Sequence, residues 1–258
     1  MLMTGSYGQR VSAPPAYYPW DDTGLSPDEI TMAEVLRERG YATGLVGKWH
    51  LGHRPPFLPT RQGFDEYFGI PYSNDMGRKN PLDLSIYPDL PLMDGETVIE
   101  TEPDQSQLVR RYTERATDFI ARHADAPFFL EIAHSMPHWP IAASDRFRGV
   151  SPRGLYGDVI AELDWSMGRI LDALHEHGLD ERTLVLFVSD NGPWLIFGNH
   201  AGSAGALREG KSTSFEGGVR VPAIARWPGH VPAGAATSAV LGLADVLPTV
   251  ARLTGATL

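Results

Sequence analysis

Residues 40–52 read Gly-Tyr-Ala-Thr-Gly-Leu-Val-Gly-Lys-Trp-His-Leu-Gly. Within this segment, residues 42–47 predict a short buried strand, because a brief apolar run with glycine on both sides is typical of a strand inside a sheet. A helical pattern precedes it over residues 27–39. Residues 26–29, Ser-Pro-Asp-Glu, have the form of a capping box with proline at the first helical position, and the glycine that opens the quoted segment ends the helix.

The same order of helix and strand recurs twice along the chain. A periodic pattern over residues 105–123 precedes an apolar strand at 127–133, and a second over 157–177 precedes a strand at 183–188. This alternation predicts an α/β fold with a mostly parallel central sheet flanked by helices. Residues 72–104 are rich in Pro, Asp and Gly and predict a long excursion over the surface. The apolar face of the third helix is expected to consist of Ile160, Leu163, Met167, Ile170, Leu171 and Leu174.

Composition bounds the class of protein. The 258 residues, 42% hydrophobic and 21% charged, are enough for one large globular domain or at most two, and a single partial domain is expected over residues 1–258. The formal charge of -10 argues against nucleic acid and anionic membranes as partners. An anionic small molecule remains compatible, because a few lysines and a metal can dominate the field inside a cleft. The absence of cysteine excludes disulfides and thiolate metal sites, and no apolar run approaches the roughly 18 residues of a membrane span.

The polar clusters fall at the ends of the predicted strands, where ligands collect in parallel sheets. Asp190 and Asn191 supply two adjacent oxygen ligands before a glycine that permits a sharp turn, which suits a hard cation such as calcium or magnesium. Asn-Gly is also the commonest tight-turn dipeptide. Both interpretations stay open at this point.

Lys48 and His50 alternate across Trp49 at another strand end. If the backbone stays extended there, both side chains point toward one site. The alternative is two ordinary solvated side chains in a loop.

Two further regions carry candidate groups. His134 and His138 lie in a stretch stiffened by two prolines, which could hold an imidazole as a general acid, although a structural histidine is the alternative for either one. Lys211 follows a glycine-rich loop and precedes the paired glycines 217 and 218, which permit close backbone approach. Alone, Lys211 is an exposed lysine.

In combination and in order, these segments resemble the sulfatase family, in its arylsulfatase A branch, over essentially the whole chain. Residues 40–52 look like the family's second signature. Further segments that resemble family blocks in the expected order are 62–65 (Gln-Gly-Phe-Asp), 71–73 (Pro-Tyr-Ser), 136–140 (Met-Pro-His-Trp-Pro), 189–192 (Ser-Asp-Asn-Gly), 210–218 (Gly-Lys-Ser-Thr-Ser-Phe-Glu-Gly-Gly) and 245–249 (Asp-Val-Leu-Pro-Thr).

The resemblance implies an alkaline phosphatase-like fold and the hydrolysis of a small-molecule sulfate ester. The family's nucleophile is a hydrated formylglycine, made by the formylglycine-generating enzyme from the Cys or Ser of a C/S-x-P-S-R motif. Asp190 and Asn191 would bind calcium, with magnesium as the alternative. Lys48 and Lys211 would contact the sulfate, His138 would protonate the departing alcohol or phenol, and His50 would bind the formylglycine hydroxyl.

The resemblance also implies that parts of the family's domain lie outside these residues. Residues 2–5, Leu-Met-Thr-Gly, look like the end of the segment that follows the nucleophile motif, which is therefore expected directly before Met1. The first strand, with two further calcium-binding aspartates, and the C-terminal subdomain are expected beyond the two ends. Without a central strand, the chain alone is expected to be poorly stable or prone to aggregation. A periplasmic, secreted or lysosomal location is a family expectation.

Two rival functions remain. A phosphatase or phosphonate hydrolase of the same superfamily would carry an Asp-His pair where this chain has Asp190 and Asn191. A catalytically inactive anion-binding protein would keep the lysines and lack the nucleophile. The identity of the sulfate ester is not encoded in any motif of the sequence.

Overall fold

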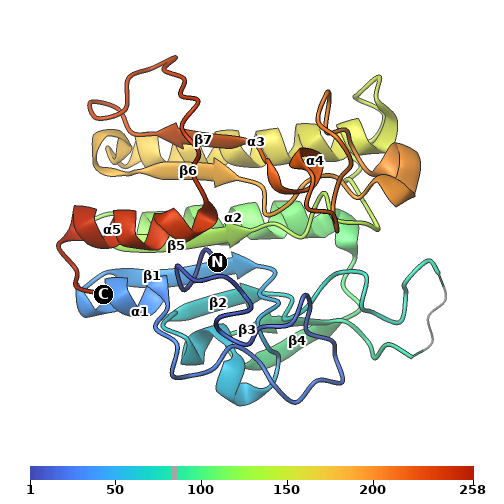
Figure 1. The fold of residues 1–258 in the computed structure, drawn as a ribbon, viewed down its shortest axis with the longest axis horizontal. Helices are drawn as coiled ribbons and strands as arrows, with labels where there is room; N and C mark the ends of the chain where they lie inside the picture. Colours follow the sequence, from blue (N-terminus) through green and yellow to red (C-terminus); the bar gives the residue numbers. More distant parts are fainter. Residues whose placement is uncertain (83–85) are drawn as a thin grey trace. The chain divides into compact units, whose positions relative to one another are not determined.

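A computed structural model of the chain describes residues 1–82 and 86–258. The chain forms two compact units (Figure 1): unit 1 comprises residues 1–135 and 239–258, and unit 2 comprises residues 136–238. No helix within the described residues is long and apolar enough to cross a lipid bilayer.

Unit 1 contains a five-stranded sheet in the order β4-β3-β2-β1-β5. The strands are β1 (Ala42–Gly47), β2 (Glu66–Gly69), β3 (Pro91–Asp94), β4 (Thr97–Thr101) and β5 (Phe128–Ala133). β1 pairs in parallel with both β2 and β5, whereas β3 and β4 are antiparallel. The α/β class and the helix-flanked central sheet are confirmed, as are the strands predicted at 42–47 and 127–133. The sheet is mixed because a hairpin extends it on one side.

That hairpin corrects the prediction of a surface excursion over residues 72–104. β3 and β4 lie within this segment, and Tyr72, Leu90 and Leu92 are buried in the core of unit 1. Strands of four or five residues give too short a periodic pattern to be distinguished from a loop. Residues 83–85 of the predicted excursion lie outside the described residues.

The first helix, α1 (Met32–Glu38), begins later than residue 27, and its capping box lies at a different serine or threonine than predicted. The Thr31 hydroxyl accepts a hydrogen bond from the backbone N–H of Glu34 at 3.2 Å, and the Glu34 carboxylate accepts one from the N–H of Thr31 at 2.8 Å. Thr31 is fully buried and also donates to the carbonyl of Gln62 at 2.7 Å. Ser26 caps only an exposed turn, through the N–H of Asp28. The buried threonine therefore starts the helix.

The remaining helices of unit 1 follow their sequence patterns more closely. The pattern over 105–123 forms a 3₁₀ turn, Gln105–Gln107, and α2 (Leu108–Arg122). α5 spans Val246–Thr254 after a 3₁₀ turn at Leu243–Asp245, and further 3₁₀ turns lie at Pro55–Phe57 and Pro59–Arg61.

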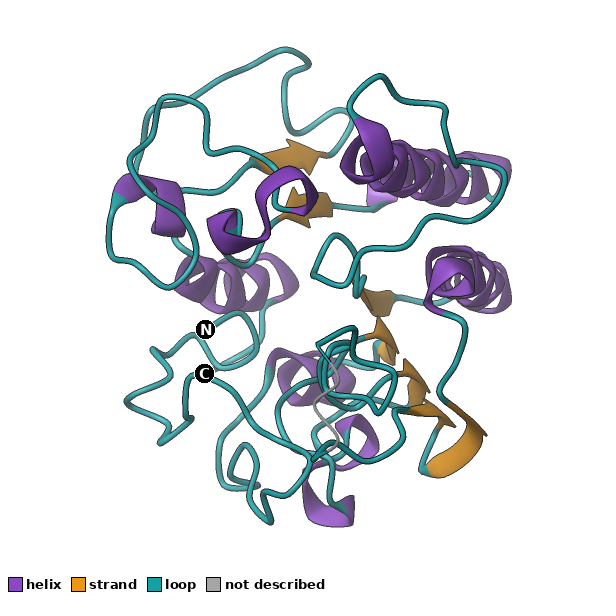
Figure 2. Cartoon of the chain, turned by 90° about the vertical axis from the view of Figure 1, so that its right-hand side faces the viewer, coloured by secondary structure: helices purple, strands orange, loops and turns teal. Residues whose placement is uncertain are grey.

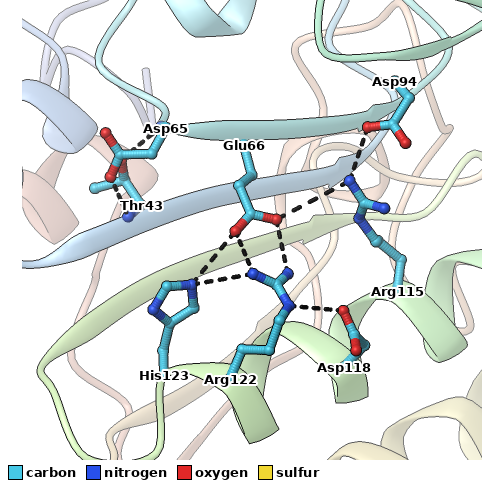
Figure 3. Close-up of polar contacts among 8 residues, drawn as sticks. All are labelled: Thr43, Asp65, Glu66, Asp94, Arg115, Asp118, Arg122 and His123. Carbon is cyan, nitrogen blue, oxygen red and sulfur yellow. Dashed lines mark hydrogen bonds and ion pairs between the residues drawn. The ribbon is translucent and has the colours of Figure 1, made fainter.

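A charged network fastens α2 to the start of β2 (Figure 3). The Arg122 guanidinium donates to both carboxylate oxygens of Glu66, at 2.6 and 2.7 Å, and to Asp118 at 2.8 Å. Arg115 donates to Asp94 on β3 at 2.7 Å. The hydrogen bonds from Arg122 hold the pKa of Glu66 below its ordinary value. The network thus fixes one helix against two neighbouring strands.

Unit 2 contains α3 (Gly154–Glu176), β6 (Val185–Val188), α4 (Glu216–Val219) and β7 (Ala223–Arg226), with 3₁₀ turns at Asp180–Arg182 and Leu195–His200. The strand predicted at 183–188 is present as β6. Its expected membership of the parallel sheet is wrong for the described residues, in which β6 pairs antiparallel with β7 in a separate two-stranded sheet.

The buried face of α3 is shifted from the predicted apolar stripe. Of the predicted stripe, Ile170 and Leu174 are buried but Ile160 is 42% exposed. Val159, Asp158 and Glu162, which lie outside the stripe, are buried as well. The two carboxylates receive backbone N–H groups of the preceding loop: Asp158 accepts from Gly149 and Ser151, each at 2.8 Å, and Glu162 accepts from Ser144 at 2.9 Å. Polar side chains that accept hydrogen bonds from the backbone of a loop can occupy a buried helix face, and the apolar pattern of the sequence does not reveal them.

Candidate active site

The residues with candidate chemistry lie outside the helices and strands, on loops and turns. Figure 2 draws such segments in teal. In unit 2 the central loop follows β6 and spans residues 189–194. The Ser189 hydroxyl donates to the carbonyl of Asn191 at 2.9 Å, and the Asn191 amide nitrogen donates to the carbonyl of Gly192 at 3.1 Å. With its NH₂ group so oriented, the amide oxygen of Asn191 keeps its capacity as an acceptor or ligand. Asp190 is exposed.

Glycines join this loop to the segment 208–218 through close backbone contact. The N–H of Gly192 donates to the carbonyl of Gly218 at 3.0 Å. A Cβ added to Gly192 would lie 1.8 Å from the carbonyl oxygen of Gly217, and one added to Gly210 would lie 2.3 Å from that of Pro193. A Cβ added to Gly217 would lie 2.0 Å from the carbonyl oxygen of Glu209, and one added to Gly218 would lie 2.4 Å from that of Thr213. The prediction that the paired glycines permit close backbone approach is therefore confirmed.

The same contact positions Lys211. Its backbone N–H donates to the carbonyl of Pro193 at 2.9 Å, and its ammonium nitrogen lies 4.8 Å from the centroid of the Trp194 ring. This distance is within the range of a cation–π interaction. Trp194 thus contacts the lysine that the sequence singled out.

His138 reaches the same tryptophan from a third segment. Its ring centroid lies 5.5 Å from that of Trp194, and its Nδ1 lies 2.7 Å from the carbonyl oxygen of Trp139. A carbonyl oxygen can only accept, so Nδ1 carries the hydrogen and Nε2 is the nitrogen that can exchange a proton. Phe197 completes the aromatic cluster, with its centroid 4.3 Å from Trp139 and 4.8 Å from Trp194.

Unit 1 contains the other two candidates, Lys48 and His50, directly after β1. The N–H of Lys48 donates to the carbonyl of Ala133 at 2.7 Å, and that of His50 donates to the carbonyl of Pro71 at 3.1 Å. The segment after β1 is therefore hydrogen-bonded to the end of β5 and to the residues that follow β2. His50 has φ 58°, in the left-handed region. The condition of an extended backbone is therefore not met at His50, and simple alternation does not set the direction of its side chain. Instead its Nε2 lies 2.9 Å from the carbonyl oxygen of Tyr17, to which it donates.

The structure separates the two histidines of the proline-rich stretch. His134 follows β5 in unit 1, where burial lowers the pKa of its imidazole to about 4. Its ring centroid lies 6.1 Å from that of Tyr112, which is also buried. An imidazole with so low a pKa is neutral near pH 7 and does not supply a proton there. The low pKa favours the structural interpretation of His134, and His138 in unit 2 stays the candidate acid.

Comparison with known proteins gives the family. The chain matches the family model described as Sulfatase over residues 1–256. It belongs to the sulfatase family. It is 41% identical over 275 residues to arylsulfatase A of Bos taurus, an alignment that covers 100% of this chain and 54% of that protein. It is also 41% identical over 267 residues to N-acetylgalactosamine-6-sulfatase of Canis lupus familiaris, covering 98% of this chain and 50% of that one.

A solved structure agrees with the family assignment. The PsFucS1 sulfatase from Pseudoalteromonas sp. superposes with a TM-score of 0.88 at 27% identity, covering 99% of this chain and 56% of that chain. The alkaline phosphatase-like fold expected from the sequence is thus the fold of this member of the sulfatase family. The chain spans about half the length of the curated sulfatases that it matches.

The sulfatase loop at 189–194 fits a hard cation in part. A carboxylate at Asp190 and an amide oxygen at Asn191 are the ligand types that calcium and magnesium take, but calcium uses about six to eight oxygens. Within residues 1–82 and 86–258, no group of three or more His, Asp or Glu side chains is arranged to hold a metal. These two residues therefore fit as part of a coordination shell.

Sequence reasoning did not find Trp194, the residue that contacts both Lys211 and His138. Trp194 comes three residues after Asn191 and has no motif of its own, so only its position in the loop after β6 could have drawn attention to it. The carbonyl of Tyr17 beside His50 was equally hidden, because a backbone acceptor leaves no trace in the residue type.

Proposed function

We propose that the protein to which this chain belongs hydrolyses small-molecule sulfate esters. The observation that carries the proposal is the convergence in unit 2: the cationic Lys211, the imidazole of His138 and the loop with Asp190 and Asn191 are joined through Trp194 and its neighbouring backbone. A fixed cation, a proton donor and hard oxygen ligands are the groups needed to bind a sulfate and release its alcohol. Membership of the sulfatase family supports the same reaction.

In this proposal each group has one role. The Lys211 and Lys48 ammonium groups bind the anionic sulfate oxygens, whose charge grows as the ester bond breaks. His138 gives the Nε2 proton to the departing alcohol or phenol. Its Nδ1–H keeps the hydrogen bond to the Trp139 carbonyl before and after that transfer, so the ring need not turn. His50, held by the Tyr17 carbonyl, binds the hydroxyl of the nucleophile.

Asp190 and Asn191 are proposed as ligands of calcium, with magnesium as the alternative. A bound divalent cation would supply Lewis-acid stabilisation of the sulfate oxygens. The nucleophile is proposed to be a formylglycine outside residues 1–258, produced by the formylglycine-generating enzyme from a Cys or Ser.

The test begins with the genomic sequence upstream of the Met1 codon, read in frame for Cys or Ser followed by x-Pro-Ser-Arg. The full-length protein is then produced with the formylglycine-generating enzyme and assayed on an aryl sulfate, with aryl phosphate and phosphonate esters in parallel. We expect sulfate ester hydrolysis that His138→Ala lowers by about 10²–10⁴-fold. An upstream stop codon without the motif would contradict the hydrolase proposal in favour of an inactive anion-binding protein. Faster cleavage of the phosphate or phosphonate ester would replace the sulfatase proposal with that of a phosphatase or phosphonate hydrolase.

A further inference from the structure

Trp194 contacts two of the proposed active-site side chains and has no role of its own in the chemistry proposed above. Its ring centroid lies 4.8 Å from the Lys211 ammonium nitrogen and 5.5 Å from the His138 ring. The edge contact with Phe197, at 4.8 Å and 86° between planes, fixes the orientation of the indole. The ring therefore packs against Phe197 while it contacts two functional groups.

We propose that Trp194 is a positioning residue, which uses the face of its indole to hold Lys211 as an ammonium at a fixed place on the ring that His138 also contacts. The inference deepens the proposed function and rests on it for the role of Lys211, but the contact itself can be tested without any catalytic readout.

The physical basis is the charge distribution of the indole. The negative face of an aromatic ring attracts a cation and does not attract a neutral amine to the same extent, and tryptophan is the strongest of the aromatic side chains in this respect. A lysine carries about 2 kcal/mol of rotamer entropy, so an unsupported side chain would spread over many positions. Both effects make the ring face a means of placing one charge accurately.

Backbone contacts of the loop also position Lys211. The backbone N–H of Lys211 donates to the carbonyl of Pro193, the residue next to Trp194. Gly210 allows that approach, since an added Cβ would lie 2.3 Å from the same carbonyl oxygen. The backbone of Lys211 and its ammonium are thus both fixed by neighbouring residues of one loop.

The lysine content of the chain permits a clean measurement. The sequence contains three lysines, at 48, 79 and 211. Lys79, in unit 1, is exposed and donates to the carbonyl of Glu102 at 3.2 Å, so it serves as an internal reference. Acylation by acetic anhydride requires the neutral amine, and mass spectrometry gives the rate at each lysine separately.

The experiment compares Lys211 acylation in the full-length wild-type protein, Trp194→Phe and Trp194→Met. Phenylalanine keeps an aromatic face, whereas methionine keeps apolar volume without one. We expect Trp194→Met to raise the rate at Lys211 about three- to tenfold relative to Lys79, and Trp194→Phe to raise it less than about twofold. Trp165→Met is the matched control, since Trp165 contacts Arg146 instead, and it should leave Lys211 unchanged.

Equal acylation rates at Lys211 in Trp194→Phe and Trp194→Met would overturn the proposal, because the ring would then only occupy volume. If Trp194→Met unfolds, which a rise at all three lysines would reveal, fluorinated tryptophan incorporated into the wild-type protein replaces it. Fluorine weakens the negative ring face with little change in shape, so Lys211 acylation should increase with the number of fluorines while Lys79 stays constant. No increase would contradict the proposal.

Kinetics then connect the contact with the reaction. We expect Trp194→Met to raise KM for the aryl sulfate and the inhibition constant of inorganic sulfate by about the same factor, and to add little in a Lys211→Met background, since both changes remove one interaction. Full additivity of the two substitutions would show that Trp194 does not act through Lys211. A protein without sulfatase activity whose Lys211 still responds to Trp194 would refute the proposed function and leave the contact established.

Discussion

The buried imidazole of His134 predicts a measurable dependence of stability on pH. Burial lowers its pKa in the folded protein to about 4 from the ordinary 6.5. The unfolded chain therefore binds a proton between these values and the folded protein does not, so the stabilising contribution is present above pH 6.5 and is lost as pH falls toward 4. For these two pKa values the loss between about pH 7.5 and about pH 5 is about 2 kcal/mol.

The assay is urea unfolding of the full-length protein and of His134→Gln at both pH values. Glutamine is polar and does not titrate, so the variant should lose about 2 kcal/mol less than the wild type over this interval. The comparison with the variant is needed because burial raises the pKa of Glu131, on the preceding strand β5, to about 7. A group with a raised pKa gives the opposite slope, since its contribution is present at low pH and is lost as pH rises.

Equal losses in wild type and His134→Gln would refute the reasoning, because they would show that His134 titrates alike in the folded and unfolded states. The imidazole would then be solvated, and the assignment of His134 as structural and His138 as the acid would have to be reconsidered.

Three further substitutions test separate parts of the structure. Thr31→Ala should lower stability by about 1 kcal/mol through loss of the buried cap of α1. Ser26→Ala, at the position predicted from the sequence, should change stability by less than about 0.5 kcal/mol. Thermal melts of the two variants distinguish the caps. Glu66→Gln should cost less than about 1 kcal/mol at neutral pH, since the pair with Arg122 is partly exposed; because the pKa of Glu66 is lowered in the folded state, the difference from wild type should vanish in urea titrations as pH falls below that lowered pKa. Gly192→Ala should lower the free energy of unfolding by about 1–3 kcal/mol and remove most of the proposed aryl sulfatase activity, because the added Cβ would lie 1.8 Å from the Gly217 carbonyl oxygen. The matched control is Gly168→Ala in α3, where an added Cβ meets nothing within 4 Å. This substitution should be neutral or stabilising.

The sequence alone predicted the elements with strong local patterns. β1, β5 and α2 lie within three residues of the bounds that apolar runs and helical periodicity predicted. The order of the short motifs also predicted the family, which the comparison confirms. These features are local, so each is written in a few consecutive residues, and hydrophobic burial makes such patterns reliable.

Other elements depended on partners that lie far along the chain. The hairpin β3–β4 is recognisable only once β2 offers an edge for pairing, and β6 pairs with β7 because β7 satisfies its backbone groups in the described structure. Thr31 rather than Ser26 caps α1, since only Thr31 meets the carbonyl of Gln62.

For the candidate site, the sequence identified the side chains, and the tertiary structure determined which residues contact them. Lys211 and His138 were found by motif, but their common contact with Trp194 arises because three separate segments of unit 2 converge. The left-handed backbone of His50 and the enclosure of His134 likewise depend on surrounding residues. Residue type fixes which chemistry a side chain can perform, whereas its charge state, tautomer and direction follow from neighbours that only folding brings together.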